Sequence, residues 1–166
     1  MTLGDASAEL RAALVDVITH GAYLLDERRF GEWIELTAPE FRYRIEAYSP
    51  DIRKEMTWLD HDRSGMAALI ELLPKHHVDG ADLLRHVSVG QVVLEGAERA
   101  RALSAVAIFS TARDTGDAHV DGGSSRLFLT GRYHDQFVRA GERWLLSARS
   151  VRIQTRQLGL GSHLFP

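Results

Sequence analysis

Histidines are the first side chains in this sequence that could do chemistry, since the chain holds eight of them. A metal site needs several ligands on one face, but neighbouring histidines point in different directions on most backbones, and no HExxH motif or comparable helical pair occurs. The pattern therefore favours a solvent-exposed loop around residues 76–79 and predicts no metal site in this chain. The candidate ligands are the pair His61-Asp62, the group His76-His77-x-Asp79, and His86.

A carboxylate on an apolar strand face is the second candidate. In the row of alternate residues from Leu127 to Phe137, Asp135 is the only carboxylate. In the next strand the row from Leu145 to Ile153 holds Arg149, and a turn near Gly141 brings the two strands side by side. A buried charge must be paired or functional, so Asp135 and Arg149 are predicted to form an ion pair that fixes the sheet.

The same carboxylate has an alternative role if the sheet curves around a pocket. Tyr43, His86, Tyr133 and Asp135 are then candidate lining groups. An apolar pocket can shift the pKa of a carboxyl group far enough for proton abstraction. Under this alternative the chain is a stand-alone isomerase, dehydratase or cyclase with Asp135, His86 and Tyr43 as its catalytic residues, or a module that binds a small ligand.

Three helices are expected to support these groups. The first begins near Ser7, a suitable cap, and carries one apolar stripe with the spacing of an amphipathic helix. A short second helix is predicted over Phe30–Leu36 and a third over Arg63–Leu73. Asp62 is the predicted cap of the third helix, and Pro74 its stop.

Strands dominate the rest of the sequence. Alternation over Phe41–Ala47 predicts a half-buried strand, and the polar stretch Asp51–Asp62 predicts a long irregular loop. Four β-rich segments follow, at about residues 84–94, 100–112, 124–138 and 143–154, and their short connections predict an antiparallel meander. Helices followed by a meander indicate an α+β fold with helices on one face of the sheet, in a single domain of residues 1–166.

One strand lacks the alternation expected of a sheet with a solvated face. The segment from Ala102 to Phe109 is nearly apolar on both faces, with Ser104 as its one polar residue. Something is therefore expected to cover its second face, either other parts of this chain or a protein partner.

Composition excludes several classes of protein. Twenty Lys and Arg against 23 Asp and Glu give a net charge of −3, which argues against a nucleic-acid binder. The chain has no cysteine, so it forms no disulfide and cannot by itself hold an iron–sulfur cluster. No apolar run approaches the ~20 residues that span a bilayer, and the first nine residues lack a signal-peptide pattern. A cytoplasmic location without membrane contact is expected.

Several short motifs run in order along the chain: Tyr23-Leu-Leu-Asp26 followed by Trp33, Leu84-Arg-His-Val-Ser88, Gly131-Arg-Tyr-His-Asp135, and Trp144-x4-Arg149-x-Val151. This series resembles the small (β) subunits of Rieske non-haem iron ring-hydroxylating oxygenases of the aromatic-ring dioxygenase type. Residues 48–63 and 158–163 more narrowly resemble the small hydroxylase subunits of methanesulfonate monooxygenases.

The resemblance implies a cone-shaped, cystatin-like or nuclear-transport-factor-like α+β fold, with N-terminal helices on a strongly curved antiparallel sheet that has a mixed edge. It also implies an α3β3 hexamer built on trimers. A separate large (α) subunit then carries the Rieske [2Fe-2S] cluster, the mononuclear iron and the active site, and receives electrons from a reductase or ferredoxin. The small subunit is structural, with no catalytic, cofactor-binding or metal-binding residue of its own. The substrate is an aromatic or sulfonated organic compound.

Overall fold

The computed structural model describes residues 7–73, 81–113 and 122–155, together with Pro166. The predicted loop group His76-His77-x-Asp79 and the predicted stop Pro74 lie outside these described residues. Along the chain the elements are α1 (Ala8–Asp26), α2 (Phe30–Ile34), β1 (Thr37–Ser49), β2 (Lys54–Asp62), α3 (Arg63–Leu72), β3 (Asp82–Leu94), β4 (Arg99–Thr111), β5 (Ser125–Ala140) and β6 (Arg143–Ile153).

The six strands of this described part form one mixed sheet in the order β2-β1-β6-β5-β4-β3. Strands β3 to β6 are antiparallel neighbours, as are β1 and β2, whereas β1 runs parallel to β6. Gly96 and Gly141 adopt positive φ angles of 79° and 65° in the tight turns after β3 and β5. The predicted meander is confirmed, and so is the mixed edge that the resemblance implied.

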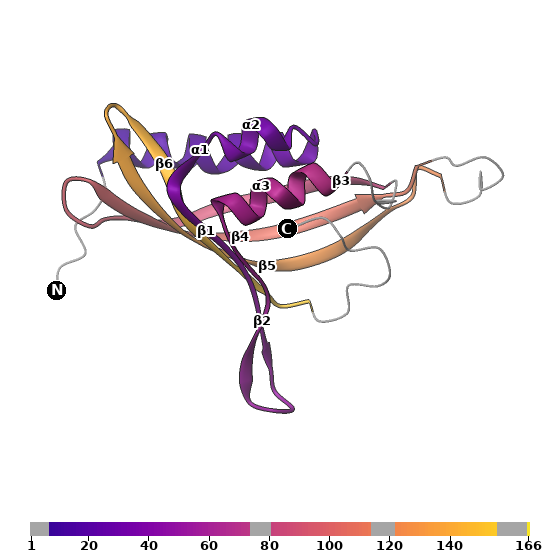
Figure 1. Ribbon diagram of the computed structural model, residues 1–166. Helices are drawn as coiled ribbons and strands as arrows, with labels where there is room; N and C mark the ends of the chain where they lie inside the picture. Colours follow the sequence, from indigo (N-terminus) through magenta and orange to yellow (C-terminus); the bar gives the residue numbers. More distant parts are fainter. Residues whose placement is uncertain (1–6, 74–80, 114–121, 156–165) are drawn as a thin grey trace.

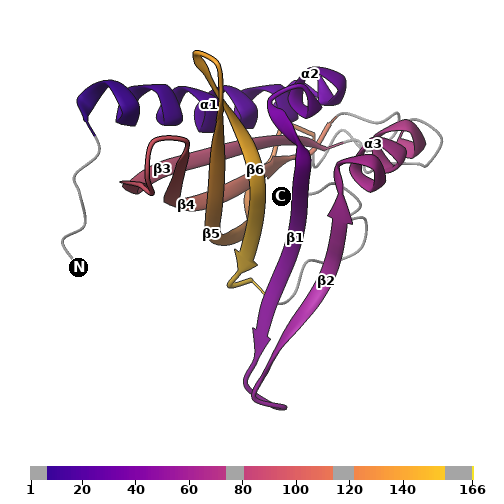
Figure 2. The ribbon, with the colours of Figure 1, turned by 60° about the vertical axis from the view of Figure 1, so that its left-hand side comes forward.

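The helices and the sheet form two layers. Figures 1 and 2 show all three helices on one side of a strongly curved sheet, with the β1–β2 hairpin extending away from the other elements. Helix α1 packs against β3, and α3 packs against β1. The predicted α+β arrangement is confirmed, and the face that meets the helices is called the inner face below.

The helix ends follow local side-chain chemistry. The Ser7 hydroxyl accepts a hydrogen bond from the Leu10 backbone N–H (3.1 Å), which confirms the predicted cap of α1. Helix α2 ends at Ile34, two residues before the predicted end, because Thr37 already begins β1 and its hydroxyl donates to the Ile34 carbonyl (2.6 Å). Pro39, which follows in β1, lies where neither neighbouring strand pairs with it.

The predicted loop over Asp51–Asp62 is wrong. Residues 54–62 form β2, an edge strand antiparallel to β1, in a register that runs from Arg42↔Asp62 to Ser49↔Lys54. A register irregularity at Ile45/Glu46 and many charged residues hide the period of two in the sequence. Charged side chains are common on edge strands because they discourage pairing with other chains.

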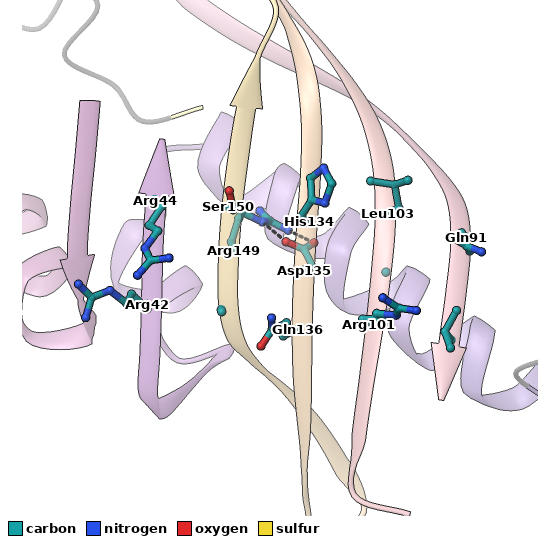
Figure 3. A pocket seen from close by; sticks show the side chains of 13 residues that line it. Arg42, Arg44, Gln91, Arg101, Leu103, His134, Asp135, Gln136, Arg149 and Ser150 are labelled. Carbon is teal, nitrogen blue, oxygen red and sulfur yellow. Dashed lines mark hydrogen bonds and ion pairs between the residues drawn. The ribbon is translucent and has the colours of Figure 1, made fainter. Parts of the chain in front are cut away.

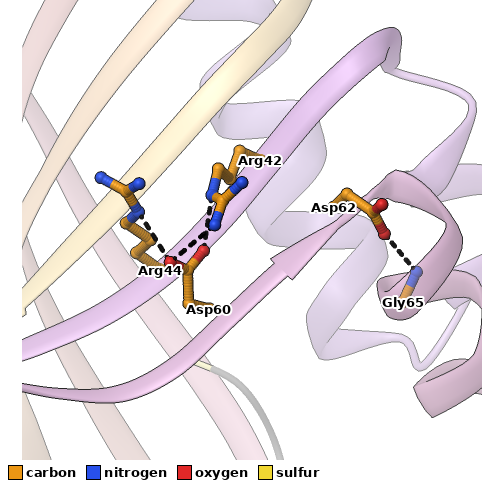
Figure 4. Close-up of polar contacts among 5 residues, drawn as sticks. All are labelled: Arg42, Arg44, Asp60, Asp62 and Gly65. Atoms are coloured by element: carbon orange, nitrogen blue, oxygen red, sulfur yellow. Dashed lines mark hydrogen bonds and ion pairs between the residues drawn. The ribbon is translucent and has the colours of Figure 1, made fainter.

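Asp62, the last residue of β2, caps the N-terminus of α3. It accepts a hydrogen bond from the Gly65 backbone N–H at 2.8 Å, as Figure 4 shows, so the predicted cap is confirmed. We expect Asp62→Ala to lower the free energy of unfolding by about 1 kcal/mol, because an N-terminal donor of α3 loses its partner. Chemical denaturation measures this, and Asp62→Asn is the control that retains an acceptor. Equal losses in the two variants would contradict the capping role.

The hydrophobic core lies between the inner face and the helices. A register irregularity at Gln136/Phe137 shifts the pairing of β5 with β6, so Leu146 faces the core instead of Leu145, which the alternation had predicted. Trp33 packs edge-on against Phe41, with ring centroids 5.8 Å apart. The largest fully buried apolar side chains are Leu14, Ile18, Leu24, Trp33, Phe41, Met66, Ile108, Leu129, Phe137 and Val151.

Candidate functional site

A charged pair lies inside the core, where β5 and β6 are neighbours. Asp135 and Arg149 are opposite each other in the register and only 1% and 2% exposed. The guanidinium Nε and Nη2 each donate to one carboxylate oxygen, both at 2.8 Å. Burial opposes the charge of Arg149, but attraction and hydrogen bonds from Asp135 outweigh it and raise the arginine pKa. The predicted ion pair is confirmed.

Two tyrosines, Tyr43 and Tyr133, lie next to this ion pair. The guanidinium of Arg149 lies over the ring of Tyr133, 4.0 Å from its centroid. Tyr43 neighbours Arg149 across the β1–β6 pairing. Burial raises the pKa of both tyrosine hydroxyls, so they remain protonated at neutral pH. Neither hydroxyl is available as a base, and within the part of the chain that the structure describes the Tyr133 hydroxyl has no hydrogen-bond partner.

Sequence reasoning missed a second internal ion pair. Arg85 of β3 has a side chain that is 2% exposed and forms an ion pair with Asp26, the last residue of α1. The Arg85 backbone N–H also donates to Asp26 Oδ2 at 3.0 Å. Alternation in β3 carries little signal, because Leu83 and Leu84 are both apolar. The pair ties the end of α1 to the sheet.

The three residues of the catalytic alternative do not surround one site. Tyr43 and Asp135 lie on the inner face, but His86 is exposed on the opposite, outer face. The His86 ring packs edge-on against Phe109, with centroids 5.5 Å apart. The expectation that His86 lines a pocket with Tyr43 and Asp135 is therefore wrong, because β3 turns Arg85 inward in its place.

Tyr43 has a second role in the fold. Its hydroxyl donates to the backbone oxygen of Pro166 at 2.7 Å, inside the protein. We expect Tyr43→Phe to lower the free energy of unfolding by about 1 kcal/mol, the usual net value of one hydrogen bond. Denaturation with urea measures this, with Tyr48→Phe at an exposed position as the control. A loss no larger than that of the control would contradict a stabilising contact.

The described residues offer no ready metal centre. Among residues 7–73, 81–113 and 122–155, no group of three or more His, Cys, Asp or Glu side chains is arranged to hold a metal ion. His61, one of the candidate metal ligands named from the sequence, lies on β2 next to the start of α3. A methyl group added at Gly65 would lie 2.9 Å from His61 Nδ1. This contact gives His61 a packing role.

The outer face of the sheet carries a hollow of about 520 Å³ (Figure 3). In the strand pairing, Arg44, Ser150, His134, Leu103 and Gln91 form one row across five strands. Partial burial lowers the pKa of His134, and Arg152 lowers it further, so this ring is neutral at pH 7. The polar side chains of the hollow are Arg42, Arg44, Gln91, Arg101, His134, Gln136 and Ser150, together with the buried pair Asp135 and Arg149 behind them.

Two of these arginines share one carboxylate on the edge strand. Arg42 donates to both oxygens of Asp60, at 2.7 and 2.9 Å, and Arg44 Nε lies 3.3 Å from Asp60 Oδ2 (Figure 4). The hydrogen bonds from Arg42 lower the pKa of Asp60, which stays ionised. Asp62 lies opposite Arg42 in the strand pairing, and Glu46 accepts a hydrogen bond from the Ser150 hydroxyl, so this side of the hollow holds carboxylates as well as the two arginines.

The sequence model of the SnoaL-like domain matches residues 6–150. The chain belongs to the SnoaL-like family. Its cone fold is also found in a nuclear-transport-factor-like protein with a cystatin-like fold from Novosphingobium aromaticivorans, with a TM-score of 0.61, 17% identity and coverage of 95% and 90% of the two chains. The fold class predicted from the sequence is confirmed.

Two relatives of this SnoaL-like chain are oxygenase subunits. The β subunit of the methanesulfonate monooxygenase hydroxylase from Methylosulfonomonas methylovora is 39% identical over 152 residues, 91% of this chain and 84% of the relative. The β subunit of 2-aminobenzenesulfonate 2,3-dioxygenase from Alcaligenes sp. is 26% identical, over 92% of this chain and 96% of the relative. The resemblance to oxygenase β subunits is confirmed.

A solved oxygenase structure has the same fold. A chain of naphthalene 1,2-dioxygenase, solved with indole bound in the active site, superposes on this SnoaL-like chain with a TM-score of 0.75 at 17% identity. The superposed region covers 97% of this chain and 87% of the dioxygenase chain. None of the helices in the described part of the chain is long and apolar enough to cross a membrane.

Proposed function

We propose that this chain is the non-catalytic small subunit of a multicomponent Rieske non-haem iron oxygenase, whose chemistry takes place in a large subunit. The 39% identity to an oxygenase hydroxylase β subunit, over 91% of this chain, is the observation that carries the proposal. The fold similarity to a chain of naphthalene 1,2-dioxygenase supports it.

The interior of the cone also supports a structural role. Both oxygens of Asp135 accept hydrogen bonds from a buried arginine that cannot lose its proton at neutral pH. A carboxylate held in this way is a weak base, the neighbouring Tyr43 keeps its proton, and His86 lies on the other face of the sheet. Asp135 and Arg149 are therefore assigned to stability and not to proton transfer.

The cofactors are assigned to the large subunit. A Rieske cluster needs two cysteine and two histidine ligands, and this chain holds no cysteine. A Rieske cluster therefore does not fit this chain, and no step of the reaction is assigned to the residues of this chain. In the proposed assembly the large subunit holds the Rieske cluster and the mononuclear iron, and a reductase or ferredoxin supplies electrons to it.

The proposed assembly is an α3β3 hexamer in the cytoplasm, in which the small subunits also associate as a trimer. For the substrate we propose an organic sulfonate, because the names of both curated relatives specify a sulfonated compound. A sulfonate-bearing aromatic ring and an alkanesulfonate both fall within this class.

Reconstitution tests this function. We expect the isolated chain to oxidise neither methanesulfonate nor 2-aminobenzenesulfonate in the presence of NADH and the electron-transfer proteins. The complex with its large subunit is expected to oxidise one of them, and removal of the small subunit is expected to abolish or strongly reduce turnover. Isomerase or dehydratase activity in the isolated chain would contradict the proposal and favour a stand-alone enzyme.

A further inference from the structure

The outer face of the sheet is the surface that the described helices leave uncovered. Figures 1 and 2 show the three helices on the opposite, inner face. On β4 the outer row from Leu103 to Phe109 is apolar but only partly buried. This row is the second apolar face for which the sequence predicted a cover.

Three arginines, Arg42, Arg44 and Arg101, line the hollow on this face, although the whole chain has a net charge of −3. The side chains of Arg42, Arg44 and Arg101 are 53%, 45% and 51% exposed, so their charges are directed to solvent. Asp60 serves both β1 arginines, and Arg101 pairs with Glu95 at 3.0 Å. Exposed ion pairs of this kind contribute little free energy, so the arginines can exchange the carboxylates of this chain for those of a partner.

The arginines stand on two opposite sides of the hollow. Arg42 pairs with Ala148, which pairs with Gln136, which pairs with Arg101. The row thus spans three interstrand steps of about 4.8 Å, or roughly 14 Å between the two arginine backbones. Figure 3 shows the neutral side chains of His134 and Gln136 between them. One small anion is too short to engage both sides, whereas two carboxylates on one segment of a protein can do so.

A second hollow lies on the same face of the sheet. This neighbouring depression, of about 420 Å³, lies along β3, β4 and β5 and includes His86, Ala105, Ala107 and Arg132. Leu103, at the edge of the basic hollow, is two residues from Ala105 on β4. The face therefore offers an apolar and polar surface beside the arginines, as protein interfaces do.

We propose that the basic hollow on the outer face docks an acidic segment of the large oxygenase subunit, with one carboxylate at Arg42 and Arg44 and a second at Arg101. This assignment rests on the proposed function, because it takes the large subunit as the partner. Complementary charges of this kind set the orientation and the association rate of a complex more than its affinity.

Charge reversal tests the assignment. Arg44→Glu and Arg101→Glu are each expected to weaken binding of the large subunit by about tenfold or more and to reduce the dependence of the association rate on salt. Arg143→Glu is the matched control, because it makes the same change in charge at an exposed position outside both hollows. The large subunit is immobilised on a surface, and the binding of each variant to it is measured at 50 and 300 mM salt. Thermal melts of each variant show whether it is folded.

The outcomes separate this inference from the proposed function. Failure of the wild-type chain to bind any large subunit would contradict the proposed function. Wild-type binding that Arg44→Glu and Arg101→Glu leave unchanged would overturn the docking surface alone. Loss of self-association with intact binding of the large subunit would show that a second copy occupies the face. Saturable, arginine-dependent binding of methanesulfonate by the isolated chain would show a small-anion site and also overturn the proposal.

Discussion

Asp135→Asn is expected to lower the free energy of unfolding by about 3–5 kcal/mol, because it leaves the buried charge of Arg149 without a counter-ion. Arg149 cannot respond by losing its proton. Equilibrium denaturation of the isolated chain measures the loss of stability. In the assembled oxygenase, the turnover of each remaining complex is expected to be unchanged.

A double substitution is the control for this pair. Asp135→Leu combined with Arg149→Met removes both charges and keeps the volume apolar, so it is expected to be less destabilising than Asp135→Asn. If Asp135→Asn abolished turnover while stability and assembly stayed normal, Asp135 would be a catalytic residue and the structural assignment would be wrong.

Gly131→Ala is expected to destabilise the sheet by on the order of 3 kcal/mol. Gly131 lies on β5 opposite Ile153 of β6, and a methyl group on it would lie 2.6 Å from the Arg152 carbonyl oxygen. The obstacle is backbone, so β5 and β6 must separate to admit the methyl group. Urea denaturation measures the effect.

Gly31→Ala is the matched control for this substitution. It adds the same methyl group within α2, where nothing lies within 4 Å. This change is expected to be neutral or to stabilise the protein by up to about 1 kcal/mol, because alanine favours helix over glycine. Similar stabilities of the two variants would contradict the close approach of β5 and β6 at Gly131.

Local signals in the sequence predicted much of the fold. The capping roles of Ser7 and Asp62 follow from side chains that accept bonds from the next turn of backbone, and both are observed. The meander follows from turn residues such as Gly96 and Gly141. The pair of Asp135 with Arg149 follows from charges in apolar rows that a short turn brings together.

Features that depend on register or on distant strands were not predictable in the same way. Strand β2 is polar and gains its structure from pairing with β1, so its own sequence resembles a loop. One position decides whether Arg85 or His86 faces inward, and the apolar residues of β3 do not settle it. The outer hollow joins Arg42 of β1 to Arg101 of β4, which no local pattern relates.

Purification of the tagged chain from its native cells, with the mass and visible spectrum of the recovered assembly, tests the central claim most directly. We predict brown, iron-containing material in which a larger second chain accompanies this one in equal amount, in a hexamer. A colourless homo-oligomer without a second chain would contradict the account and return attention to a stand-alone role for the cone interior around Tyr43 and Asp135.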